Sequence, residues 1–124
     1  MKEYIENQES VCRWCNEHYP DETKKTSVFN LLEEVIELAV AAGVEINDIN
    51  RIASISYNKS VADLGKSADV PKELGDVQIS LYSLAGIWGY DALQCCDEKM
   101  ASNRERSTDE SKARLEAKKN KGLR

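Results

Sequence analysis

The stretch LLEEVIEL, residues 31–38, places three glutamates within an otherwise apolar segment. On an α-helix with about 100° between successive residues, Glu37 lies about 40° and Glu34 about 100° from Glu33, so the three carboxylates share a narrow sector. Apolar residues fill the arc on both sides of this sector, which predicts a helix that uses most of its surface for packing. Residues 26–50 contain no lysine or arginine, although a solvated helix face normally mixes basic side chains with glutamates. The segment therefore predicts a packed helix with an acidic strip that needs a counter-charge.

The composition predicts one mainly helical domain. The chain has 124 residues, only two prolines and 6% aromatic residues, which favours helices over strands. A net charge of -5 disfavours nucleic acid as a partner, because a phosphate backbone requires clustered lysine and arginine. No run is long and apolar enough to cross a membrane, and the polar start MKEYIENQE is unlike a targeting peptide. We therefore expect a cytoplasmic protein with neither nucleic acid nor membrane as a partner.

Helical periodicity and capping residues predict an all-α fold, a four- to five-helix antiparallel bundle. The predicted helices cover residues 3–18, 27–42, 71–89 and 91–106. Thr26 or Ser27 is expected to cap the second helix, and Gly43 to end it. Asp91 is expected to cap the last helix, in a capping box with Gln94.

Two other segments are less regular. The stretch NDINRIASISYN, residues 47–58, predicts a short helix, and residues 59–70 predict a polar linker, or a loop that carries Lys59 or Lys66 to a site. Six basic and three acidic side chains follow residue 106, a mixture unlike a nucleic-acid arm. We expect a helical domain over 1–106 and a charged tail, helical or disordered, over 107–124.

The four cysteines form two pairs, Cys12 with Cys15 and Cys95 with Cys96. A zinc site needs the two pairs to converge, whereas adjacent residues of a helix point about 100° apart. Small buried residues on one helix face also follow a CxxC spacing. Reduced structural thiols are therefore the favoured interpretation, ahead of a metal or redox role.

Glu73 and Asp76 form a second acidic pair, three residues apart on one face of the predicted helix over 71–89. Gly75 leaves room beside them for another chain or a ligand. Five carboxylates on two apolar helices repel one another unless a cation neutralises them. Oxygen donors favour Mg²⁺ or Mn²⁺ over zinc, and the single histidine disfavours a ferritin-like di-iron site.

These acidic motifs resemble those of a known family. EEVIE at 33–37 and ELGD at 73–76 resemble the EExxE…ExxD signature of the all-α nucleoside triphosphate pyrophosphatases, the MazG-like group. The order of the other elements is also similar, from Trp14 through Asn30-Leu31-Leu32 to the K…N..R spacing within residues 89–106.

The resemblance implies a Mg²⁺-dependent enzyme, for which Mn²⁺ can substitute. It would hydrolyse a nucleoside triphosphate between its α- and β-phosphates, giving a monophosphate and pyrophosphate, in house-cleaning of the nucleotide pool. The implied metal ligands are Glu34, Glu37, Glu73 and Asp76. Glu33 is implied as a further ligand or as the group that orients the attacking water, so Glu33, Glu34 and Glu37 are the catalytic candidates.

The resemblance also implies a phosphate-binding set and an assembly. Lys99, Asn103 and Arg106 match the family's spacing, and their own spacing places two cations and an amide along one helix face, suited to a phosphate chain. The family builds its site in a dimer or a dimer of dimers. We therefore expect the bundle to be completed by homo-oligomerisation.

Residues that bind the base are the least defined part of the predicted site. An aromatic ring can stack on a base and an amide can read its edge. These requirements select Trp14, His18, Asn30 and Tyr82, with Phe29 as a further candidate.

Other functions remain open. The segment 44–70 is longer than in compact members of the family, which leaves the substrate open: a narrower one such as dUTP, dCTP or phosphoribosyl-ATP is the nearest alternative. A non-enzymatic, cation-binding helical dimerisation module is a second alternative. A thiol-based redox or zinc protein is a third, through the four cysteines.

Overall fold

The computed structural model describes residues 2–63 and 69–124. Over these residues the chain has six helices and no strand, which confirms the predicted all-α fold class. The helices are α1 (Gln8–His18), α2 (Lys24–Ala41), α3 (Ile46–Asp63), α4 (Val70–Trp88), α5 (Ala92–Asn103) and α6 (Thr108–Asn120).

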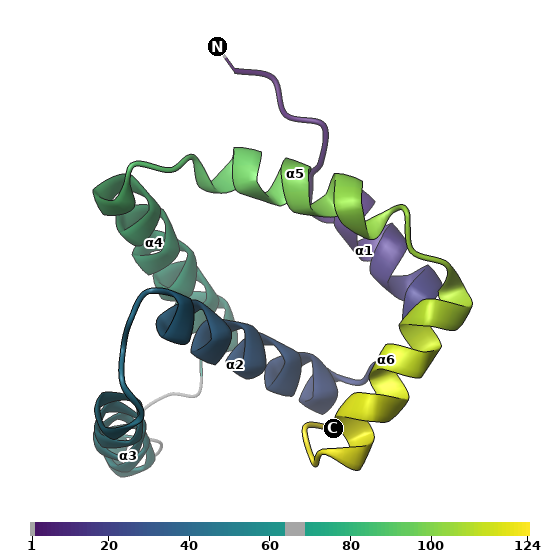
Figure 1. Cartoon of the computed structure of the whole chain (residues 1–124). Helices are drawn as coiled ribbons and strands as arrows, with labels where there is room; N and C mark the ends of the chain where they lie inside the picture. Colours follow the sequence, from purple (N-terminus) through teal and green to yellow (C-terminus); the bar gives the residue numbers. More distant parts are fainter. Residues whose placement is uncertain (1, 64–68) are drawn as a thin grey trace.

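The helices follow the outline of an open ring (Figure 1). α2, α4, α5 and α6 form its sides, with α1 beside α6 and α3 set apart from the others. α1 packs against α6, and α4 packs against α5. The part of the chain predicted as a charged tail thus contains a helix that packs on the first one.

The first two helices begin at different residues than predicted. α1 begins at Gln8 because the Asn7 side chain accepts a hydrogen bond from the Ser10 N–H at 2.8 Å. α2 begins at Lys24, since Thr23 is its cap and accepts from the Thr26 N–H at 3.1 Å. Thr26, one of the two predicted caps, completes this box by accepting from the Thr23 N–H at 2.8 Å. A capping box joins two residues three apart, so the sequence pattern alone left the cap ambiguous.

The predicted ends of α2 and α4 and the predicted cap of α5 agree with the structure. Gly43 and Gly89 follow α2 and α4 with φ of 86° and 78°, a left-handed conformation that favours glycine. Asp91 caps α5 by accepting from the Gln94 N–H at 3.0 Å. The Gln94 side chain instead donates to Glu98 at 3.2 Å, so the predicted reciprocal bond is replaced.

α3 is longer than the sequence pattern predicts. It continues from Ile46 through Asp63, so residues 59–63, which were predicted as loop, are helical. No proline or glycine interrupts the chain between these bounds, and small polar residues continue a helix at modest cost. Lys59 is exposed on α3. Residues 64–68 of the predicted loop, which include Lys66, lie outside the described residues, and Asp69 and Val70 cap and begin α4.

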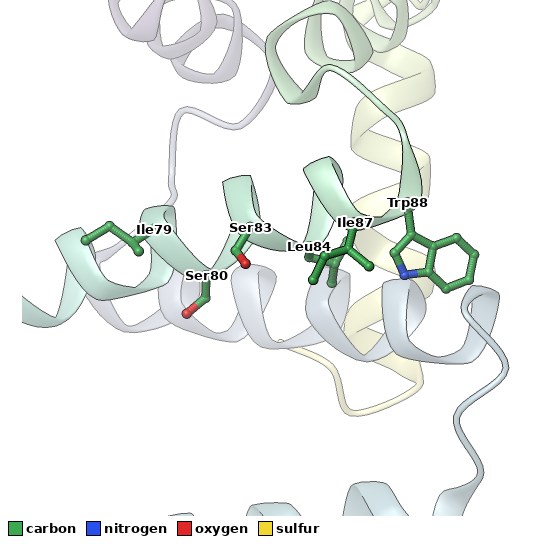
Figure 2. A pocket seen from close by; sticks show the side chains of 6 residues that line it. All are labelled: Ile79, Ser80, Ser83, Leu84, Ile87 and Trp88. Atoms are coloured by element: carbon green, nitrogen blue, oxygen red, sulfur yellow. The ribbon is translucent and has the colours of Figure 1, made fainter.

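The buried core is small and lies mainly where α1, α5 and α6 meet. Trp14, His18, Met100 and Ser111 are buried there, and Ala85 is buried on α4. Most large apolar side chains of α2, α3 and α4 are exposed by contrast. Figure 2 shows one such face, a groove along α4 lined by Ile79, Ser80, Ser83, Leu84, Ile87 and Trp88.

Candidate functional site

A cavity of about 380 Å³ lies between α1, α2, α5 and α6. Its size is that of a small-molecule site. The charged residues that line it are Glu22, Glu34, Glu37, Lys99, Arg106, Arg114, Lys118 and Arg124. The remaining lining residues are amides, aromatic rings and apolar or thiol groups: Asn30, Asn103, Trp14, Tyr19, Val11, Cys15, Met100 and Leu115.

The α2 glutamates form a compact cluster at this cavity. Glu33, Glu34 and Glu37 each offer a carboxylate oxygen, and these oxygens lie within 4.8 Å of one another. The charge of Glu34, followed by burial, raises the pKa of Glu37 above its usual value. Mutual repulsion of this kind is relieved by a cation, and an all-carboxylate donor set suits a hard divalent ion. The residues present therefore fit Mg²⁺.

Glu33 differs from its two neighbours because its carboxylate is already paired. Lys118 Nζ lies 3.2 Å from one oxygen and Arg124 Nη1 lies 3.1 Å from the other, and the Glu33 side chain is only 10% exposed. Burial alone would raise the pKa of Glu33, but hydrogen bonds and charges from Lys118 and Arg124 outweigh it and lower that pKa. Glu34 and Glu37 are the α2 acids that line the cavity.

The three residues predicted to bind phosphate line the same cavity. Lys99 and Asn103 lie on α5, and Arg106 follows that helix. Arg106 is held in place because its guanidinium donates to the Tyr19 hydroxyl at 3.2 Å and to the Asn103 amide oxygen at 3.4 Å. The fold thus brings two carboxylates of α2 to the same cavity as the Lys99, Asn103 and Arg106 set.

Trp14 and His18, two base-binding candidates, form a buried stack. Their ring centroids lie 4.0 Å apart with an interplanar angle of 19°, so His18 covers one face of the indole. His18 Nδ1 is 2.6 Å from the buried Ser111 Oγ. Trp14 is 7% exposed, and its Nε1 donor has no hydrogen-bond acceptor among the described residues. Trp14 thus lines the cavity with one face of its ring covered by His18, and the Arg106 guanidinium lies 5.9 Å from its ring centroid.

The other two base-binding candidates lie in different places. The Asn30 side chain lines the cavity, and its amide oxygen accepts from Arg124 Nη2 at 2.5 Å. Tyr82 is exposed on α4 and is not part of the cavity wall. The base-binding roles of all four residues stay predictions.

Glu73 and Asp76 are not brought to the α2 acids within this chain. Both are exposed on α4, and the acidic cluster found among the described residues contains only the three α2 glutamates. A Cβ added at Gly75 meets no atom within 4 Å, so this face of α4 is open. Their predicted role as metal ligands therefore requires a further packing partner for α4.

The four cysteines are free thiols, and Cys15 is half-buried at the edge of the cavity. Burial raises the pKa of the Cys15 and Cys96 thiols. A raised pKa disfavours the reactive thiolate. No cysteine belongs to a potential metal-binding group in the part of the chain that the structure describes.

Sequence reasoning missed the contribution of α6 to this cavity. Arg114, Lys118 and Arg124 were expected only in a charged tail, because basic and acidic residues mixed in this way do not indicate a binding role. The signal that could have found them is the lack of basic partners near Glu33, combined with six basic residues after position 106.

Comparison of the chain with protein-family models, with curated proteins and with solved structures finds no match. No described helix has both the length and the apolar composition needed to cross a membrane. The residues of the cavity themselves therefore carry the functional interpretation.

Proposed function

We propose that the protein is a Mg²⁺-dependent nucleoside triphosphate pyrophosphohydrolase that releases a monophosphate and pyrophosphate. The observation that carries this proposal is that one cavity contains both Glu34 and Glu37, which form no ion pair among the described residues, and the predicted phosphate-binding set Lys99, Asn103 and Arg106. A metal-bound polyphosphate needs both kinds of group close together. The EExxE…ExxD resemblance supports the same reaction and a role in house-cleaning of the nucleotide pool.

The side chains have distinct tasks in this proposal. Bound Mg²⁺ would neutralise phosphate charge and activate water. Glu34 and Glu37 would hold the ion, and a carboxylate oxygen that is not used in coordination could accept the proton of the attacking water. Lys99 and Arg106 would neutralise the pyrophosphate as it leaves, and Asn103 would orient it.

Glu33 serves a different purpose from its neighbours in this proposal. The side chains of Lys118 and Arg124 pair with the two oxygens of Glu33. A metal ion at Glu33 would therefore have to displace both side chains. We therefore assign metal binding on α2 mainly to Glu34 and Glu37. The roles predicted for Glu33, as a further ligand or as the group that orients water, would require those two ion pairs to open.

We further propose that a second copy of the chain completes the site. The apolar faces of α2 and α4 are exposed, and a chain of this size needs to bury much more of its surface to be stable. Glu73 and Asp76 share α4 with the groove of Figure 2. Packing α4 against another copy would give these two acids access to an α2 cluster, in a homodimer or a dimer of dimers.

A panel of canonical and modified ribo- and deoxyribonucleoside triphosphates with Mg²⁺ tests the proposed reaction. Chromatography of the products should show a monophosphate and pyrophosphate for at least one substrate. The same panel, with phosphoribosyl-ATP included, distinguishes a broad substrate range from a narrow one such as dUTP or dCTP. Absence of turnover with every compound would contradict the proposal.

A non-enzymatic helical dimerisation module is the second candidate. The internal neutralisation of Glu33 and the exposed apolar faces favour it, because neither requires a reaction. This candidate predicts Mg²⁺-dependent thermal stabilisation and self-association without turnover of any nucleotide. The substrate panel therefore decides between the two.

A further inference from the structure

α6 forms part of the cavity wall, outside the region that carries the family resemblance. Arg114, Leu115 and Lys118 line the cavity from α6, and Arg124 lines it from the residues that follow. Positions 114 and 118 are four apart, so their side chains share one helix face. α6 thus presents two adjacent cations to the same space as Lys99 and Arg106.

The charge of the cavity is opposite to that of the whole protein. Five basic and three acidic side chains line the cavity. Glu33 is not part of the wall, but it adds a fourth acid through its ion pair with Lys118. The wall is therefore net positive in a chain whose net charge is -5. Such a local positive field favours a multiply charged anion over a neutral or cationic ligand.

Arg124 fixes the position of α6 against α2. Its side chain is 5% exposed, and its guanidinium donates to Glu33 Oε1 at 3.1 Å, to the Asn30 amide oxygen at 2.5 Å and to the Leu123 carbonyl at 2.7 Å. Bonds to three acceptors leave this side chain little freedom to bind a ligand. Arg124 therefore anchors the end of α6 to α2.

Arg114 and Lys118 have N–H donors that are not used in ion pairs among the described residues. Lys118 is 27% exposed and pairs with Glu33, which uses one of the three N–H groups of its ammonium. Arg114 takes part in no ion pair among the described residues. A guanidinium without a carboxylate partner, at the wall of a positive cavity, is available for bidentate binding of phosphate.

We propose that Arg114 and Lys118 bind the phosphate chain of the nucleotide, together with Lys99 and Arg106. The nature of the ligand rests on the proposed function, whereas the phosphate-binding role of α6 can be tested without catalysis. α6 would then be part of the active site, although its residues lie beyond the predicted domain at 1–106.

Calorimetric titration with inorganic tripolyphosphate in the presence of Mg²⁺ measures this role directly. Arg114→Ala should weaken binding about tenfold or more, because a charge-assisted hydrogen bond is lost. Lys112→Ala is the matched control, since it removes the same charge from α6 at an exposed position that does not line the cavity. Circular dichroism of each variant would show that α6 is retained.

Lys118 requires a second background because its loss also leaves Glu33 with an uncompensated charge. Lys118→Ala is therefore compared with the wild type, and the double variant Glu33→Gln/Lys118→Ala is compared with Glu33→Gln. If Lys118 touches phosphate, the loss of tripolyphosphate affinity persists in the Glu33→Gln background. A loss that disappears there would show that Lys118 only neutralises Glu33, and would overturn its assignment.

Nucleotide hydrolysis separates failure of this inference from failure of the proposed function. An active wild type whose Arg114→Ala and Lys118→Ala variants match Lys112→Ala in both KM and tripolyphosphate affinity would overturn the inference alone. A wild type that binds tripolyphosphate through Arg114 and Lys118 but hydrolyses no nucleotide would refute the proposed reaction and support the phosphate site.

Discussion

Two regions of the ring differ in the kind of contact that they make. Around α1, α5 and α6 the chain is held by specific polar bonds, among them Arg104 with Glu6, Tyr4 with Asp91 and His18 with Ser111. α2, α3 and α4 expose rows of apolar side chains instead. The first region makes its contacts within the chain, whereas the second leaves its apolar side chains exposed. The proposed site lies at the boundary, with its acids on α2 and its bases on α5 and α6.

The largest effect is expected from Glu37→Gln, at that boundary. Activity should fall by roughly a hundredfold or more, because a carboxylate that is proposed to hold the metal is lost. The metal-free variant should be as stable as the wild type or more so, since repulsion from Glu34 is relieved. Initial rates and thermal unfolding measure the two effects. Glu45→Gln, an exposed glutamate outside the cavity, is the control, and an unfolded or fully active Glu37→Gln would refute the assignment.

Met100→Ala tests whether the α1–α5–α6 region is stabilised within one chain. Met100 is buried, and removal of a buried methionine side chain costs about 2–5 kcal/mol of unfolding free energy. The loss should be the same at every protein concentration. Leu74→Ala on the exposed face of α4 is the contrasting variant, and it should destabilise only where chains associate. Equal, concentration-independent losses would remove the distinction between the regions.

Ile87→Asp tests the proposed association through α4. Ile87 is 82% exposed and lines the groove of Figure 2. If a second copy buries it, a charge there should weaken dimerisation about tenfold or more, since burying an isoleucine contributes about 1.5–3 kcal/mol.

Light scattering over a dilution series measures the effect of Ile87→Asp. Ile5→Asp is a closely matched control, because Ile5 is 85% exposed on the segment before α1. A wild type that stays monomeric at all concentrations would contradict the proposed assembly.

A smaller effect is expected from Glu6, in the polar region. Hydrogen bonds from Arg104, at 2.8 Å from both Nε and Nη2, lower the pKa of Glu6 from 4.5 to about 2, and Ser10 adds a further bond. Because the folded-state pKa is depressed, the stabilisation is complete above pH 4.5 and is lost as the pH falls towards 2. The difference in Tm between wild type and Glu6→Gln should therefore shrink over that interval.

Glu9→Gln is the control for this pH dependence. The ion pair of Glu9 with Arg13 is exposed, and such pairs contribute little to stability. Its Tm should follow that of the wild type from neutral to acid pH. A Glu6→Gln curve parallel to the wild type would show that the Arg104 pair adds no pH-dependent stability.

Local features of the molecule could be predicted from the sequence. The α2 glutamates lie together because their spacing alone sets their positions on a helix. Asp91 and Gly89 mark helix ends through bonds that span a few residues. The capping boxes at Asn7 and Thr23 shifted two helix starts, which is the usual uncertainty of boundaries that depend on side-chain rotamers.

Long-range features could not be predicted in the same way. Glu33 pairs with Arg124 across 91 positions of the chain, and no local pattern specifies that partner. Lys118 has an equally good local explanation in the helix dipole, because it lies in the last turn of α6. The distance between Glu73 and the α2 acids depends on how the apolar faces are packed, which helical periodicity does not encode.

The anchor between α2 and Arg124 also sets an order of events during synthesis. The ribosome makes the chain from its amino end at about 5–20 residues per second. Glu33 therefore emerges several seconds before Arg124 can reach it, and α2, α3 and α4 are complete while the acidic cluster still lacks Lys118 and Arg124. During that interval no basic side chain of α6 offsets the mutual repulsion of the three glutamates. The counter-charge for Glu33 is therefore supplied only after α6 and the residues that follow it have been made.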